Sequence, residues 1–342
     1  MKRLKPSWVF SLLVLVFLGV VLLGFSIGSV PISLGTTLKV LLKTLGFPFE
    51  TAPEDEVILL LLRLPRVAKA ALVGGGLALC GVLMQAVFRN PLADPALLGV
   101  SSGGALAAVI ALSLGAAFAG AWTVPLVAFI GAVVASASVL AIGGIRRKAH
   151  LLTLLLGGLA VNAMAAALIS LILIRSATSD EVRTLLFWLM GSVESQGWTE
   201  VTVLFFFVLA GGIPAFLSSR TLNLLLLDDA EAQSLGLSVR RFRLWMLAIN
   251  ALVAGAAVAV SGIIGFVGLM VPHMGRRLTG PGHRFLLPVS VLGGAILLIS
   301  ADLISRSVVG PTEIRVGIVM ALLGAPVFLI LLLSRKGTKE LL

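Results

Sequence analysis

Long stretches without a single Asp, Glu, Lys or Arg alternate with short polar segments along this chain. A helix needs about 20 apolar residues to cross the ~30 Å hydrocarbon layer of a membrane, because each residue adds ~1.5 Å. Strands of a membrane β-barrel would instead be ~9–11 residues long with alternating polarity. The pattern therefore predicts an all-α, polytopic membrane protein. The uncharged stretches are 6–38, 70–88, 95–145, 149–174, 201–219, 244–275, 285–301 and 316–334.

Two of these stretches are longer than one crossing requires. Residues 95–145 have room for two helices, with a turn near Gly120 to Pro125. Residues 244–275 have room for one full crossing and a short second helix, divided near Ser261 and Gly265. Hydropathy alone thus predicts nine or ten crossings.

The basic residues decide between these two numbers, because short loops rich in Lys and Arg stay on the cytoplasmic side. With ten transmembrane helices and both termini cytoplasmic, 17 of the 26 Lys and Arg residues and five of the 15 acidic residues lie inside. The balance is then +12 inside against −1 outside. We predict one transmembrane domain over residues 1–342, with no sizeable soluble part. An apolar segment within residues 183–194 is too short to span and predicts an external short helix.

Composition agrees with this class, since 59% of the residues are hydrophobic and only 12% charged, whereas a soluble domain carries about 25% charged residues. The net charge of +11 comes from short basic clusters between apolar stretches, so it does not indicate a nucleic-acid partner. One cysteine and three histidines offer little for a metal site, and we predict neither a metal nor a cofactor. The P-loop pattern G-x-x-x-x-G-K-[ST] does not occur, so any ATP that drives this protein is bound by a partner subunit.

The segment Gly99 to Gly103 matches G-x-S-x-G, which in hydrolases presents a nucleophilic serine after a strand. Here the segment opens a transmembrane helix, and no histidine is placed to act as a base for Ser101. Small residues that let helices approach closely are the better explanation. The same explanation applies to the glycines at 74–76 and 157–158. We therefore expect no enzymatic activity in this chain.

Arg63-Leu64-Pro65-Arg66 lies at the external mouth of the second predicted helix, with Pro65 placed in its first turn. Two arginines at a helix N-terminus oppose the helix dipole, which predicts that anionic groups face them. Contact with lipid phosphates is the alternative. On the ninth predicted helix, Asp302 and Arg306 are four residues apart and predict an ion pair on one face.

Two polar segments on the predicted cytoplasmic side carry further signals. The turn after Arg89 contains Asn90, Pro91 and Asp94, and we predict that Asp94 caps the next helix. Residues 228–236 predict a short helix with an acidic first turn and a glycine stop. An exposed, capped helix of this kind is expected to dock onto a partner. Its candidate docking residues are Asp228, Asp229, Glu231, Ala232, Leu235 and Gly236.

Four blocks of sequence together resemble the permease subunits of ATP-binding-cassette (ABC) importers for iron-siderophores, heme and vitamin B12, the type II importers. The likeness runs from about residue 57 to 334. The blocks are Arg63 to Arg66, Gln85 to Pro95 running into Leu97 to Ser101, Gly265 to His273, and Gly324 to Phe328.

The resemblance implies a homodimer with the substrate path at the dimer interface, two cytoplasmic ATP-binding subunits and one external substrate-binding protein, either periplasmic or a lipoprotein. It implies a multi-pass protein of the bacterial inner membrane. The family's arginines at the positions of Arg63, Arg66 and Arg306 accept carboxylates from the binding protein. Its cytoplasmic coupling segment, between helices six and seven, corresponds to residues 221–236.

The implied function is alternating-access import of an iron complex, a siderophore or heme, with vitamin B12 or another chelate or an oxyanion as the alternative. Around residues 150–153 the chain is apolar where the vitamin B12 member carries small hydroxyl residues, which argues against vitamin B12. An ion-coupled secondary transporter is the competing class. It would need ionisable groups inside the membrane, and Asp302 is the one candidate that the sequence suggests.

Overall fold

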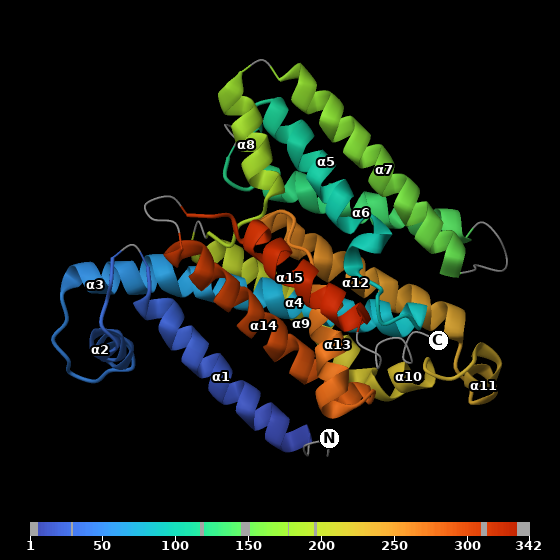
Figure 1. Cartoon of the computed structure of the whole chain (residues 1–342), viewed down its shortest axis with the longest axis horizontal. Coiled ribbons are helices and arrows are strands. Elements are labelled where there is room, and N and C mark those ends of the chain that lie inside the picture. Colours follow the sequence, from blue (N-terminus) through green and yellow to red (C-terminus); the bar gives the residue numbers. More distant parts are fainter. Residues whose placement is uncertain are drawn as a thin grey trace.

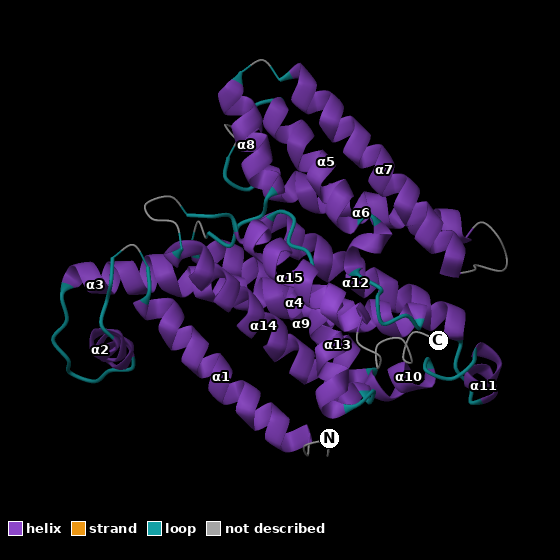
Figure 2. Ribbon diagram, in the orientation of Figure 1, coloured by secondary structure: helices purple, strands orange, loops and turns teal. Residues whose placement is uncertain are grey.

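A computed structural model describes residues 6–28, 30–116, 120–144, 151–176, 178–194, 197–308 and 313–333. Within these ranges the regular structure is helical throughout, and loops join the helices (Figure 2). His150 and the basic clusters at 2–5, 146–148 and 335–339 lie outside the described residues.

The helices are, in chain order, α1 (Pro6–Ser26), α2 (Leu34–Thr44), α3 (Pro53–Val57), the π-helical turn η1 (Ile58–Arg63), α4 (Leu64–Phe88), the 3-10 turn η2 (Pro95–Leu98), α5 (Val100–Ser113), α6 (Thr123–Gly144), α7 (Leu151–Arg175), α8 (Ser179–Leu189), α9 (Trp198–Leu217), α10 (Ser219–Leu224), α11 (Asp229–Ser234), α12 (Val239–Ser261), α13 (Val267–Thr279), α14 (His283–Ser307) and α15 (Val316–Leu333).

Helix α4 is the centre of the bundle. Every residue from Val73 to Phe88 is buried, because α9, α12, α13 and α14 pack around it (Figure 1). A helix that is apolar on all sides is expected at such a position. At the crossing of α4 and α14, a β-carbon at Gly74 would overlap the carbonyl oxygen of Gly294. The glycines predicted to permit close approach therefore do so here.

The second predicted helix begins earlier than expected. We expected it to start around Pro65, but α3, η1 and α4 form one continuous helical segment, Pro53–Phe88. Proline lacks the N–H group that an α-helix interior requires. The wider π-helical turn η1 ends at Arg63, two residues before Pro65. This turn lets the helix continue through the proline.

Helices α5 to α8 form a separate lobe beside the central bundle, at the top of Figure 1. The lobe contacts the bundle mainly where α12 packs against α5 and α6. Asn162 of α7 accepts a hydrogen bond from Ser102 of α5 at 2.5 Å and donates one to the carbonyl oxygen of Ala96 at 3.2 Å. These bonds hold α7 against the segment that follows the 90–95 turn.

Both long apolar stretches divide into two helices, as predicted. Residues 95–145 contain α5 and α6, but the break begins after Ser113 and α6 begins at Thr123, so Pro125, which we placed in the turn, lies in the first turn of α6. Residues 244–275 contain most of α12 and of α13, and the break follows Ser261. The first stretch, 6–38, also divides, since α2 begins inside it with Ser33 as its cap.

The short helix predicted within residues 183–194 is α8, but its limits differ. It begins at Ser179 because the Thr178 side chain accepts a hydrogen bond from the N–H of Glu181. It ends at Leu189, and Gly191 then adopts a φ of +67°. The polar residues before the apolar stretch thus belong to the helix, and the residues after Gly191 do not.

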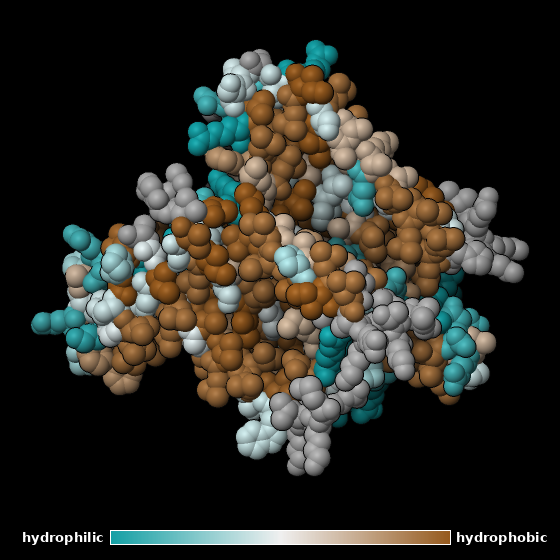
Figure 3. Space-filling model, in the orientation of Figure 1, coloured by the Kyte–Doolittle hydropathy of each residue, from teal (hydrophilic) through white to brown (hydrophobic). Residues whose placement is uncertain are grey.

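The exterior is suited to a membrane. Seven of the described helical segments are long and apolar enough to cross one, and two more apolar helices are shorter. The face shown in Figure 3 is dominated by apolar side chains. Helix α7 alone exposes Leu152, Leu156, Leu159, Met164 and Ile174. Lipid or a partner subunit is needed to cover such a surface, so the chain is a polytopic membrane protein.

Candidate functional site

The three arginines selected from the sequence lie together at one end of the bundle, called here the arginine end. Arg63 is the last residue of η1, Arg66 lies in the first turn of α4, and Arg306 lies in the last turn of α14. They line a cavity of about 260 Å³ together with Glu194 and Glu313. Segments far apart in the sequence, two helix ends and two loops, thus bring three cations and two carboxylates to one place.

Arg63 points into the protein. Only 5% of the residue is exposed, and its guanidinium donates hydrogen bonds to the carbonyl oxygens of Phe25, Ser26 and Val30. These carbonyls belong to the end of α1 and the segment after it. Arg63 therefore fixes the end of α1 against the central helix.

Asp302 lies between the other two arginines and is completely buried. Its Oδ1 atom accepts hydrogen bonds from Nε and Nη2 of Arg66 at 3.0 and 2.8 Å. The Nε atom of Arg306 is 3.1 Å from Oδ2 of Asp302. The predicted Asp302–Arg306 pair is therefore present, and Arg66 shares the same carboxylate.

Arg66 also binds Glu313, which the sequence analysis did not select. Nη2 of Arg66 donates to Oε2 of Glu313 at 2.7 Å, and Nη1 donates to Oε1 at 3.2 Å. The Glu313 side chain is 43% exposed, whereas that of Asp302 is 0% exposed. The anionic groups that face Arg66 are thus two carboxylates of the chain itself. An acidic residue three positions before the last apolar stretch was the one signal for Glu313 in the sequence.

The opposite end of α4 carries the second candidate site, called here the α11 end. Asp229 opens α11 and accepts hydrogen bonds from Nη2 of Arg89 at 2.6 Å and from Nη1 and Nη2 of Arg243 at 2.8 and 2.7 Å. Arg89 is the residue that ends α4, with a left-handed φ of +48°. Its Nε also donates to the carbonyl oxygen of Leu225. Asp229 therefore ties α11 to both α4 and α12.

The contacts of Asp229 with Arg243 and Arg89 lower the pKa of its carboxyl group. Partial burial alone would raise the pKa of its carboxyl group, because burial disfavours the charged form. The hydrogen bonds and the charge of Arg243, followed by the charge of Arg89, outweigh burial and hold the pKa below its ordinary value of 3.8. Asp229 is thus an anion at neutral pH.

The remaining residues predicted for this segment form a short helix, as expected, but the Asp228 side chain makes no capping hydrogen bond. Asp228 occupies the N-cap position with an extended backbone, and Gly236 ends the segment with a φ of +87°. Ala232 is buried against the bundle, while Glu231 and Leu235 are exposed. The outer surface of α11 therefore offers a carboxylate and an apolar side chain to a partner.

The turn between α4 and α5 has the predicted form. Asn90 accepts a hydrogen bond from the N–H of Leu92 at 2.9 Å, and Pro91 follows Asn90 in the turn. The Asp94 side chain accepts one from the N–H of Ala96 at 2.9 Å and caps η2. Because Arg89 precedes this turn and binds Asp229, the turn and α11 lie next to each other.

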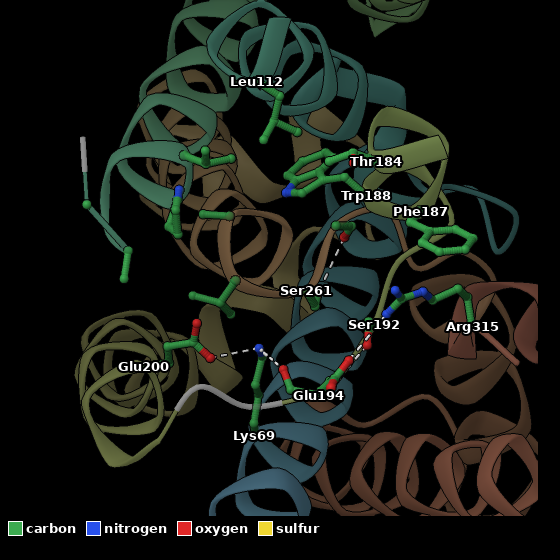
Figure 4. A pocket seen from close by; sticks show the side chains of 17 residues that line it. Lys69, Leu112, Thr184, Phe187, Trp188, Ser192, Glu194, Glu200, Ser261 and Arg315 are labelled. Atoms are coloured by element: carbon green, nitrogen blue, oxygen red, sulfur yellow. Dashed lines mark hydrogen bonds and ion pairs between the residues drawn. The ribbon is translucent and has the colours of Figure 1, made fainter. Parts of the chain in front are cut away.

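A second cavity, of about 550 Å³, lies between the α5–α8 lobe and the central bundle (Figure 4). At its base the ammonium group of Lys69 binds Glu200 at 2.8 Å and the carbonyl oxygen of Glu194 at 2.7 Å. Trp188 closes another side, and the guanidinium carbon of Arg315 is 4.7 Å from the ring centre of Phe187. Sequence reasoning missed the Lys69–Glu200 pair. Its signal was one lysine between Arg66 and Arg89 in an otherwise uncharged stretch.

Neither cavity has the donors of a metal centre. Within the ranges that the structure describes, no three His, Cys, Asp or Glu side chains come together to hold a metal ion. Cys80, in the middle of α4, is fully buried among apolar side chains. The two sites consist of charged groups that bind one another or are available to partners.

The structure is a polytopic helical bundle with a cluster of arginines at one end and a short exposed helix at the other, and comparison with known proteins gives its family. The model of the FecCD transport family matches residues 13–334. The chain belongs to the FecCD transport family. It is a permease subunit of the ABC importer class.

Three similar proteins illustrate the range of the family. The hemin transport system permease protein HmuU of Yersinia pestis is 42% identical over 285 residues, covering 82% of this chain and 84% of HmuU. The cobalamin import system permease protein BtuC of Halobacterium salinarum is 41% identical over 291 residues, covering 85% of this chain and 76% of BtuC. A solved structure of a metal-chelate type ABC transporter in an inward-facing conformation superimposes with a TM-score of 0.83 at 32% identity, covering 96% and 99% of the two chains.

Proposed function

We propose that two copies of this chain form the membrane path of an ATP-driven importer for an iron complex, a siderophore or heme. In this assembly two cytoplasmic ATP-binding subunits contact the α11 end, and an external substrate-binding protein docks at the arginine end. The chain crosses the bacterial inner membrane ten times with both termini in the cytoplasm. It holds no cofactor, and ATP is bound by the partner subunits.

The position of the two candidate sites at opposite ends of α4 is the observation that supports this proposal. Arg66 lies in the first turn of α4 and Arg89 is its C-cap residue, so the two sites are separated by the length of one buried helix. With ~1.5 Å per residue this distance is about 35 Å, slightly more than the hydrocarbon layer of a membrane. One helix therefore carries a contact surface for each side of the membrane.

The two ends suit the two kinds of partner. At the arginine end, Arg66 presents the more accessible guanidinium, with a side-chain exposure of 14% against 3% for Arg306. Arg63 and Arg306 add positive charge beneath it. At the α11 end, residues 221–236 form the coupling segment, in which Asp228, Glu231, Leu235 and Gly236 are open to a partner. Asp229 and Ala232 hold the segment to the bundle.

The substrate is proposed from the relatives and from the chemistry of the chain. Relatives are named for hemin, achromobactin, iron-hydroxamate, cobalamin and molybdate transport. An iron chelate is common to several of these names, so we place it first, with vitamin B12, another chelate or an oxyanion as the alternative. Identifying the ligand that co-purifies with the associated binding protein by mass spectrometry tests this choice. A bound iron chelate supports it, and a corrinoid or an oxyanion contradicts it.

A second candidate, ion-coupled transport, has one observation in its favour, the buried Lys69–Glu200 pair. Uptake into proteoliposomes separates the two functions. Import that requires ATP and the ATP-binding subunit supports the importer. Import by the chain alone, driven by a proton or sodium gradient, would contradict it.

A further inference from the structure

Arg66 divides its guanidinium between two carboxylates that differ in accessibility. Asp302 is fully buried and is also bound by Arg306, so it is a fixed part of the structure. Glu313 is 43% exposed and reaches Arg66 from the segment before α15. The outer edge of the Arg66 guanidinium is thus covered by a side chain that solvent can reach.

We propose that Glu313 occupies the position on Arg66 that a carboxylate of the external binding protein takes when it docks. This inference rests on the proposed function and adds a competitor to the docking site. Glu313 presents both carboxylate oxygens to two guanidinium nitrogens, which is the arrangement that any other carboxylate prefers with arginine. Docking is then an exchange of one carboxylate for another, and Arg66 keeps a partner throughout.

The other two arginines of the cavity do not offer such an exchange. Arg63 donates to three main-chain carbonyl oxygens, and its burial leaves no edge for a partner. Arg306 binds Asp302 and donates to the carbonyl oxygens of Ile27 and Gly24. Arg66 alone among these three arginines holds an exposed carboxylate, so it is the position where an acidic side chain from outside can enter.

Displacement of Glu313 by another carboxylate would also affect the segment that leads into α15. Glu313 is three residues before α15, which begins at Val316. The N–H of Ile314 donates to the carbonyl oxygen of Ser305 at 3.2 Å, and Arg315 lies 3.4 Å from Glu194. Displacing Glu313 removes one of the attachments of this segment to the bundle. Docking at Arg66 thereby acts on the beginning of α15.

The test measures the affinity of the co-purifying binding protein for the permease–ATPase complex in nanodiscs of zwitterionic lipid. Glu313→Gln keeps the size of the side chain and removes the competing charge. An exposed ion pair contributes ~0.2–1 kcal/mol, so we expect binding that is about 1.4- to five-fold tighter. Glu56→Gln is the matched control, because Glu56 lies on the same helical segment as Arg66, Pro53–Phe88, but outside the cavity, and forms a surface ion pair with Lys43 of α2. It should leave the affinity unchanged.

A third variant, Arg66→Gln, separates this inference from the docking role itself. Weaker binding in Arg66→Gln together with unchanged or weaker binding in Glu313→Gln would overturn the exchange and leave docking at Arg66 intact. Unchanged binding in Arg66→Gln would overturn both. An increase in affinity for Glu313→Gln that disappears when anionic lipid is added would overturn the exchange in the native membrane and assign the edge of Arg66 to lipid headgroups.

Discussion

The Nη2 atom of Arg89 lies 2.6 Å from Oδ1 of Asp229, which joins the end of α4 to the beginning of α11. Arg243 of α12 binds the same carboxylate with two nitrogens. We therefore expect a movement imposed on α11 to be transmitted to α4 and α12 through this one side chain. This connection is specific enough to be tested by single substitutions.

Replacing Asp229 by asparagine should uncouple ATP hydrolysis from transport. The substitution removes the negative charge that Arg89 and Arg243 share, so α11 loses its attachment to α4 and α12. We expect the amount of substrate imported per ATP hydrolysed, measured in proteoliposomes, to fall at least several-fold.

Asp228→Asn is the control for this prediction. Asp228 is the neighbouring carboxylate, but its side chain is 95% exposed and its nearest oxygen is 3.9 Å from Arg89. This variant keeps the ion pairs of Asp229 with Arg89 and Arg243, so its ratio of transport to hydrolysis should fall less than that of Asp229→Asn, and any fall reports the contact of Asp228 with a partner subunit. Equal ratios in both variants would show that the Asp229 ion pairs do not transmit movement.

The attachment of α11 should depend on pH in a defined direction. The pKa of Asp229 is lower in the folded protein than its ordinary value of 3.8. The stability that it contributes is therefore fully present above about pH 4–5 and is lost as the pH falls through the lowered pKa. Hydrogen exchange of the α11 amides, corrected for the intrinsic rate, should be constant from about pH 7 to 5 and rise below this range. The Asp229→Asn variant should show no such rise.

Arg63 should behave as a structural residue. Arg63→Met leaves three carbonyl oxygens near α1 without their donor, and a hydrogen bond to a charged group contributes ~1.5–3 kcal/mol. We expect a clear decrease in the thermal unfolding temperature of the purified chain. Arg183→Met is the comparison, because Arg183 is exposed and lies 5.0 Å from the ring centre of Phe187. An unfolding temperature for Arg63→Met as high as that for Arg183→Met would contradict this role.

The Lys69–Glu200 pair gives a prediction about charge burial. Lys69→Met leaves the buried Glu200 without its cation, and breaking such a pair costs ~3–5 kcal/mol. Removing both charges, in Lys69→Met with Glu200→Gln, should recover much of the lost stability. Urea or thermal unfolding of the two variants measures the difference. A double variant less stable than the single one would indicate that Glu200 is stabilised independently of Lys69.

The sequence predicts the features that are set locally. The apolar stretches give the helices and the break near Ser261, and they show that residues 95–145 divide into two helices. The acidic start and glycine stop give α11, and the four-residue spacing gives the Asp302–Arg306 pair. Each of these depends on residues close together in the chain.

The remaining contacts join residues that are far apart, and local patterns do not specify them. Glu313 meets Arg66 across 247 positions, and Asp229 meets Arg89 across 140. The burial of Arg63 follows from the π-helical turn η1 and from the path of the chain after α1. The hydropathy pattern predicts neither the π-helical turn nor the path of the chain after α1. The sequence therefore identified the three arginines but did not show which of them is accessible to a partner.

The most direct test of the account is the rate of ATP hydrolysis by the complete permease–ATPase complex in nanodiscs, measured with increasing amounts of the external binding protein. If α4 connects an external docking site to the α11 end, saturating binding protein should change the rate of hydrolysis on the opposite side of the membrane. A rate that stays the same at every concentration, while binding itself is saturated, would contradict the account.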